Sequence, residues 1–320
     1  MLVYHLYALN IRYYPDFVFP DFFSAGTVGV DIFFVISGFV MALVTSNSKP
    51  GYHTVRSFVL KRVTRVYPIY WIYTLIVLLI YFVRPDVVNS SYLQTPSIVK
   101  SLLLFPDITN PWLSVGWTLI YEVYFYFLVA ILLFFNMRIR NILLCLYFLF
   151  LVLYNVLFYI DTNPVFPVEK YYLSPLICEF ILGYGLFFFY GFRPLSFVIG
   201  FVLSSLCFLF VISTSYWVDV DSNLIRLLVF GLPSVLFVYG FQSCFIGKRK
   251  FGVMARLGDI SYSTYLSHVL VLNAVGLFFK LIGLDGIFGS LLCLIISVFA
   301  VYVWSYFSYF YIEKKVSKFG

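Results

Sequence analysis

The sequence predicts an all-α integral membrane protein that crosses the bilayer about ten times, with both termini in the cytoplasm. Of its 320 residues, 62% are hydrophobic and only 11% are charged, whereas about a quarter of the residues in soluble domains are charged. The apolar runs are continuous and roughly 18–22 residues long, the length of a helix that spans a bilayer. The net charge of +7 is therefore expected to reflect basic cytoplasmic loops, and no nucleic acid is expected as a partner.

Apolar segments separated by charged loops define the expected helices. The longest outer loop, between Arg84 and Val115, should contain a short interfacial helix over Ile98–Phe105. Together the segments are expected to form a single domain covering residues 1–320. The expected membrane segments are residues 1–9, 24–45, 67–83, 116–135, 141–160, 173–190, 195–213, 225–244, 260–279 and 287–311.

The basic residues predict the orientation in the membrane. With the N-terminus in the cytoplasm, 15 of the 21 Lys and Arg residues fall on the cytoplasmic side and most acidic residues fall outside. Because basic loops remain in the cytoplasm, we expect a multi-pass protein of the cell (inner) membrane. The basic residues expected outside are Arg12, Arg84, Lys100, Lys170, Arg226 and Lys280.

The first segment is shorter than a bilayer requires. Residues 1–9 would rise about 14 Å as a helix, roughly half of a hydrocarbon core of about 30 Å. Either the true start lies upstream of Met1, or the first helix is only a truncated stub. The five cysteines show no metal-ligand spacing, and no metal site is expected.

Four polar residues within the apolar segments are predicted to lie at one depth, in the outer half of the bilayer. Asp31 lies about two turns below the outer end of the second segment, and Glu122 and Glu179 lie at similar depths in the fourth and sixth. His5 lies about one turn from the outer end of the first segment. A histidine near carboxylates is the arrangement expected of a general base. The alternative is that each residue separately hydrogen-bonds a neighbouring helix.

Two further groups of polar residues lie on the cytoplasmic side. Arg62 and Arg65 are three residues apart, so they are expected to share a helix face at the cytoplasmic mouth of the third segment. Guanidinium groups suit phosphates, although plain anchoring by basic residues is the alternative. His268 lies about two turns into the ninth segment from the cytoplasm and is expected at a different level from His5. Packed hydrogen bonding is the commoner role of such a histidine.

These residues stand in stretches that resemble the membrane-bound acyltransferase 3 family, and the resemblance covers nearly the whole chain. In that family an Arg precedes the first-helix His by about a dozen residues, a position that would lie upstream of Met1. The stretches that carry the resemblance are Tyr4–Leu6, Gly29–Phe39, the pair Arg62 and Arg65 with Tyr67–Trp71, Trp117–Tyr126, Ile260–His268 and Glu313.

The resemblance implies an enzyme that moves an acyl group from acyl-CoA, usually acetyl-CoA, to a hydroxyl of an extracytoplasmic sugar or lipid-linked glycan, such as a polysaccharide. His5 would act as general base or acyl carrier, and Asp31 or Glu122 would orient its ring. Arg62 and Arg65 would hold the phosphates of the donor, and no permanently bound cofactor is expected. The residues expected to contact the acceptor are Trp117, Tyr121 and His268.

Two alternatives remain open at this point. Buried acids and histidines in ten helices are also compatible with a transporter or exporter of a polysaccharide precursor. Against that alternative, the sequence shows no pair of Gly/Pro-broken helices at corresponding positions of two halves, and no inverted hydropathy repeat. An inactive, truncated family member is the second alternative.

Overall fold

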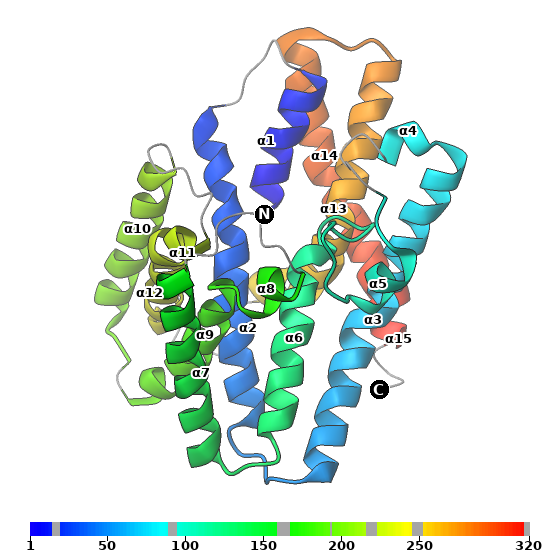
Figure 1. Ribbon diagram of the computed structural model, residues 1–320. Coiled ribbons are helices and arrows are strands. Elements are labelled where there is room, and N and C mark those ends of the chain that lie inside the picture. Colours follow the sequence, from blue (N-terminus) through cyan, green and yellow to red (C-terminus); the bar gives the residue numbers. More distant parts are fainter. Residues whose placement is uncertain are drawn as a thin grey trace.

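A computed structural model describes residues 1–14, 20–88, 95–158, 167–192, 194–215, 223–244 and 252–316, and every regular element in these ranges is a helix (Figure 1). The elements are α1 (Leu2–Tyr13), η1 (Asp21–Val28), α2 (Gly29–Thr45), α3 (Tyr52–Val83), α4 (Pro85–Val88), α5 (Ile98–Leu103), α6 (Gly116–Leu132), α7 (Met137–Phe158), α8 (Pro167–Tyr172), α9 (Leu176–Phe192), α10 (Phe197–Thr214), α11 (Asn223–Arg226), η3 (Leu227–Gly231), α12 (Leu232–Ser243), α13 (Gly252–Leu281), α14 (Gly286–Ser308), η4 (Tyr309–Glu313) and α15 (Lys314–Val316).

Eight helical spans in the described ranges are long and apolar enough to cross a membrane. The 17-residue α6 and the 12-residue α1 are the two remaining segments that the sequence predicted. The prediction of an all-α, polytopic membrane protein is thus confirmed, and the short helix α5 forms where it was expected. Five basic residues expected in the cytoplasm lie outside the described residues: Arg193, Lys248, Arg249, Lys250 and Lys318.

Helix α3 begins 15 residues before the apolar segment from which it was predicted. It starts after Gly51, whose φ of 138° is a conformation that favours glycine, and continues through Pro68. Its 32 residues would span about 48 Å, which exceeds the hydrocarbon core of a bilayer. The basic first part of α3, which contains Arg62 and Arg65, is therefore a continuation of the membrane helix and not a separate loop.

Helices α2 and α9 pack backbone to backbone in the centre of the molecule. A Cβ atom at Gly38 would lie 1.9 Å from the carbonyl oxygen of Phe180, and one at Gly183 would lie 2.0 Å from that of Val35. Glycine on both helices is the usual way in which membrane helices approach this closely. The contact fixes the depth of Asp31 on α2 relative to Glu179 on α9.

Helix α1 begins in the middle of the molecule and runs beside α13 and α14 (Figure 1). Its buried Asn10 donates a hydrogen bond to the hydroxyl of Ser290 on α14, at 2.8 Å. The helix continues to Tyr13, four residues beyond the predicted end. His5 therefore lies one turn from the beginning of α1 and two turns from its end, deeper than expected.

Candidate functional site

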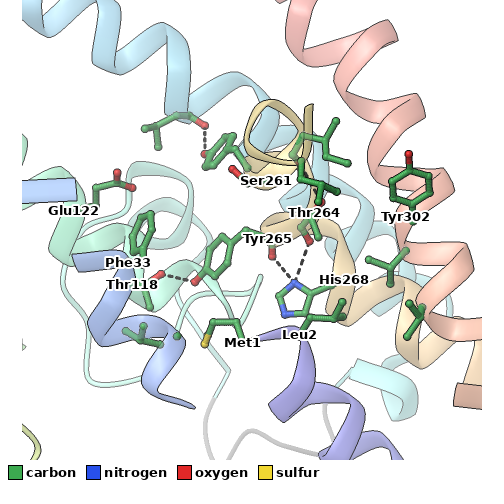
Figure 2. Close-up of a pocket in the computed structure, with 18 of the residues that line it drawn as sticks. Met1, Leu2, Phe33, Thr118, Glu122, Ser261, Thr264, Tyr265, His268 and Tyr302 are labelled. Carbon is green, nitrogen blue, oxygen red and sulfur yellow. Dashed lines mark hydrogen bonds between the residues drawn. The ribbon is translucent and has the colours of Figure 1, made fainter. Parts of the chain in front are cut away.

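A cavity of about 470 Å³ opens between the start of α1 and helices α2, α3, α6, α13 and α14 (Figure 2). Most of its wall is apolar, but several polar side chains reach it. Three of the predicted site residues line it, namely Arg65, Glu122 and His268. The other polar side chains of the wall are Thr118, Ser261, Tyr262, Thr264, Tyr265 and Tyr302.

His268 is held with one ring nitrogen bonded and the other free. Its Nδ1 lies 3.1 Å from the carbonyl oxygen of Thr264 and 2.6 Å from that of Tyr265. Carbonyl oxygens only accept, so Nδ1 carries the proton and Nε2 presents the lone pair. The residue is 1% exposed, and Nε2 has no hydrogen-bond partner among the described residues. Figure 2 shows Nε2 facing the beginning of α1, where Met1 and Leu2 lie.

His5 lies against His268, with ring centroids 4.8 Å apart and the planes at 65°. The prediction that the two histidines occupy different levels is therefore wrong. Helix α13 begins at Gly252, eight residues before the expected start, so His268 is about 24 Å along it. Helix α1 begins in the middle of the molecule, so its first turn lies at the same depth (Figure 1).

Glu122 is 6% exposed and reaches the cavity from α6. Its carboxylate accepts hydrogen bonds from the hydroxyl groups of Ser37, at 3.3 Å, and of Tyr126. Arg65 lines the same cavity and supplies a positive charge. Among the described residues no hydrogen bond joins Glu122 to His5, whose ring instead contacts the rings of Tyr4 and His268.

Asp31 lies in a separate ion-pair cluster. Its carboxylate binds the guanidinium group of Arg226 in a bidentate manner, with distances of 2.9 and 2.8 Å. Asp31 and Glu179 are both 0% exposed. Glu179 lies beside this pair, and neither of its oxygens has a hydrogen-bond partner in the described part of the chain. The shared depth of Asp31 and Glu179 thus produces a cluster around Arg226, not an orienting group for His5.

Sequence reasoning placed Arg226 in an outer loop and missed this role. The residue stands at the end of α11, immediately before the π-helical turn η3 (Leu227–Gly231) that leads into α12. The sequence did contain a signal for this pairing. Arg226 stands at the outer edge of an apolar segment, at the end of the bundle where Asp31 and Glu179 were already expected.

Arg62 and Arg65 do not share a cavity. Arg62 packs over the rings of Phe58 and Tyr126, at 5.4 and 5.5 Å, and lines a second cavity of about 430 Å³. Positions three residues apart on a helix differ by about 60° around its axis. The two residues are thus neighbours on one face of α3, as expected, but their side chains line different cavities.

Trp117 and Tyr121 lie outside both cavities. They pack edge to face, with centroids 6.0 Å apart, and the buried hydroxyl of Tyr121 donates to the carbonyl oxygen of Lys170 at 2.8 Å. Tyr265 instead reaches the first cavity, where its hydroxyl donates to the carbonyl oxygen of Val115 at 2.6 Å and contacts the hydroxyl of Thr118. The sequence could have pointed to Tyr265, because it stands one helical turn before His268.

The described residues include no group of three His, Cys, Asp or Glu side chains that could hold a metal ion. The cavity wall instead carries one imidazole, one carboxylate and one guanidinium group, from His268, Glu122 and Arg65, and the ring of His5 packs against that of His268.

The helices and this cavity define a polytopic membrane protein with a polar site inside its bundle. The chain belongs to the acyltransferase domain family, whose model matches residues 1–310, which confirms the family resemblance. It is 29% identical over 265 residues to the exopolysaccharide production protein ExoZ of Rhizobium meliloti (strain 1021), covering 79% of this chain and 78% of that protein. No solved structure matches the chain. The protein is therefore a membrane acyltransferase by family.

Proposed function

We propose that the protein transfers an acyl group, acetyl being the expected one, from acyl-CoA to a hydroxyl group of an extracytoplasmic sugar. The observation that carries this proposal is the contact of the His5 ring with the ring of His268, which lines a cavity together with Glu122 and Arg65. Two neutral imidazoles in an apolar site suit proton transfer from a hydroxyl group.

His5 is the general base or the acyl carrier, and His268 is its positioning residue. Because Nδ1 of His268 faces two carbonyl oxygens, its Nε2 lone pair can accept an N–H from His5. The other nitrogen of His5 then holds a lone pair for the sugar hydroxyl. This is the role that an orienting group plays beside a catalytic histidine in hydrolases.

The reaction balances without a further reactant. The sugar oxygen attacks the thioester carbon, a C–O bond forms and the C–S bond breaks. The hydroxyl proton passes to His5 and from there to the departing thiolate of coenzyme A. In the covalent version His5 first takes the acyl group from sulfur and then gives it to the sugar oxygen.

The similarity to an exopolysaccharide production protein favours an exopolysaccharide, or its lipid-linked precursor, as the acceptor. The donor would reach the cavity from the cytoplasmic side, because Arg65 lies on the basic part of α3. The acceptor would meet it at the depth of His5. We place the protein in the inner membrane for this reaction.

Membranes that contain the protein, incubated with radiolabelled acetyl-CoA and an exopolysaccharide acceptor, test the proposal. Wild-type protein should transfer label to the glycan, and His5→Ala should abolish transfer while the protein remains folded in the membrane. Tyr7→Phe on the same helix, which removes a hydrogen bond to Asp21 (2.8 Å), is the matched control and should keep its activity.

Full activity in His5→Ala would refute the assigned base. Absence of transfer by the wild type, together with acetyl-independent movement of a glycan precursor across the membrane, would support the transporter alternative instead.

A further inference from the structure

A third cavity, of about 400 Å³, lies between the beginning of α13 and the end of α14 with the turn η4. The π-helical turn η4 packs on α13, and such turns are frequent at functional sites. The cavity opens on the outside of the bundle, since Leu257, Tyr302 and Tyr306 on its wall are each about half exposed. The aromatic rings that line it belong to Tyr302, Tyr306, Tyr309 and Phe310.

Two side chains of opposite charge reach this cavity without a partner. Arg256 and Asp259 stand three residues apart on α13, so they are neighbours on its surface, and both are exposed. Neither makes a hydrogen bond or an ion pair with any residue that the structure describes. The hydroxyl group of Tyr309 lies close enough to Asp259 to interact with its charge, and it makes no hydrogen bond within the described ranges either.

The charges on the wall select the kind of ligand. Arg256 and Asp259 give the wall no net charge, and the carboxylate of Glu313 lies close enough to Asp259 to add to its negative potential. A polyphosphate would be repelled by both carboxylates, and a free cation would be repelled by the guanidinium group. A zwitterion, in which a short link joins an anionic and a cationic group, satisfies Arg256 and Asp259 together.

The position of the cavity fits the level of phospholipid headgroups. Lys314 and Lys315 follow η4 directly, and basic residues at the end of a membrane helix are typical of its cytoplasmic boundary. Tyrosine is enriched at the same level because its ring is apolar and its hydroxyl group is polar. An aromatic belt alone would account for the rings, but not for a cavity that both Arg256 and Asp259 line.

We propose that this third cavity binds the headgroup of phosphatidylethanolamine, a phospholipid with one phosphate and one primary ammonium group. The guanidinium group of Arg256 binds the phosphate, and the ammonium group donates to the carboxylate of Asp259. The faces of the tyrosine rings add a cation–π attraction for the same ammonium group. This lipid site does not depend on the proposed function.

A lipid bound here would also border the first cavity. Leu257, Ile260 and Tyr302 line both cavities, and Figure 2 shows Tyr302 on the opposite side of the first cavity from Glu122. The headgroup would therefore cover the side of the first cavity at which these three residues stand. A bound phospholipid thus becomes part of the wall that separates the acyl-transfer site from the bilayer.

Native mass spectrometry of the full-length protein, titrated in detergent with dioctanoyl phosphatidylethanolamine, tests the site. Arg256→Gln and Asp259→Asn should each weaken binding about fivefold, the effect of losing one partly exposed charge contact. Lys280→Gln removes an exposed charge at the other end of α13, outside the cavity, and should remain within about twofold of the wild type. Equal affinities in all four proteins, or no binding of the lipid, would overturn the site.

The choice of headgroup is tested with dioctanoyl phosphatidylglycerol, which carries the phosphate but no ammonium group. The wild type should bind it about fivefold more weakly than phosphatidylethanolamine, and Asp259→Asn should abolish this preference because the repelling carboxylate is lost. A wild type that prefers phosphatidylglycerol, or a preference that survives in Asp259→Asn, would overturn the assignment of the ammonium group. The same holds if phosphatidylcholine, whose nitrogen carries no proton, binds as tightly as phosphatidylethanolamine.

The link to the first cavity is tested in the acetyl-transfer assay. Adding phosphatidylethanolamine to delipidated wild type should raise the rate, and Asp259→Asn should respond less at the same lipid concentration. Equal responses would overturn the link while the binding data still decide the lipid site. Absence of transfer in every protein, with normal lipid binding, would count against the proposed function and not against this site.

Discussion

Two groups of charged side chains are buried in this helical bundle, and they differ in what surrounds them. Around Asp31 the space is filled, since Arg226 takes both carboxylate oxygens and Glu179 packs beside the pair. Around His268 a cavity remains open, and one ring nitrogen has no partner in the described structure. Asp31 and Arg226 thus satisfy each other, whereas the unpartnered Nε2 of His268 borders a cavity that a ligand can enter.

The largest expected effect is a loss of acyl transfer when His268, at the wall of the open cavity, is replaced. His268→Leu removes the Nε2 lone pair that faces α1, and we expect acyl transfer to fall by about 10²–10⁴-fold, the usual contribution of a positioned proton-transfer group. Release of free coenzyme A from acetyl-CoA measures the rate. Ser267→Ala, one residue away in the same turn, is the control and should transfer normally. A rate for His268→Leu close to that of the wild type would remove His268 from the site.

Breaking the ion pair between Asp31 and Arg226 should lower the stability of the folded protein. Arg226→Gln leaves the carboxylate of Asp31 buried without its partner, which should lower the free energy of unfolding by about 3–5 kcal/mol. Asp31→Asn in the same chain should recover most of this loss. The thermal midpoint of the detergent-solubilised protein, followed by tryptophan fluorescence, measures both. The exposed Arg84→Gln should change stability by less than about 0.5 kcal/mol. Equal midpoints for Arg226→Gln and Arg84→Gln would contradict the role of the pair.

The close contact between α2 and α9 should tolerate no side chain at Gly183. Gly183→Ala drives a methyl group into the carbonyl oxygen of Val35 on α2, and we expect a loss of about 1–3 kcal/mol. Gly185→Ala on the same helix has open space around its Cβ and should be neutral or stabilising by up to about 1 kcal/mol. The same melting experiment compares them, and a Gly183→Ala protein as stable as Gly185→Ala would contradict the close contact.

The smallest effect is expected at the rim of the open cavity. Tyr265→Phe removes the hydrogen bond to the carbonyl oxygen of Val115 (2.6 Å) and should cost about 1 kcal/mol of stability. Tyr302→Phe, at a half-exposed position on α14 (50%), should cost less. Melting midpoints that rank the two variants in the opposite order would show that Tyr265 is not a structural anchor.

Much of the fold follows from the sequence because apolar length and basic loops dominate the free energy of a membrane helix. The membrane segments were predicted in this way, whereas the family was predicted from the stretches that resemble it. The starts of α3 and α13 were not, because Arg62 and Arg256 belong to helices that extend beyond the apolar stretch. A hydrophobicity pattern marks the bilayer, not the end of a helix.

The site could be predicted only in part, since depth along a helix does not specify the direction in which a side chain points. Asp31 and Glu179 were expected at a common depth, and the structure places them side by side. Their distance from His5 depends on rotation about α2 and α9, which the glycine contacts at Gly38 and Gly183 determine. The pairing of His5 with His268 depends on the tertiary position of α1, for which one sequence carries no signal.

The bond between Asp31 and Arg226 has a consequence for biogenesis. The two residues are separated by 195 positions in the chain, so at about 5–20 residues per second the ribosome needs roughly 10–40 s to supply the guanidinium group after the carboxylate. During that interval α2 carries an acid that a bilayer tolerates poorly. The ion pair that neutralises this acid therefore forms only after the 195 intervening residues have been made.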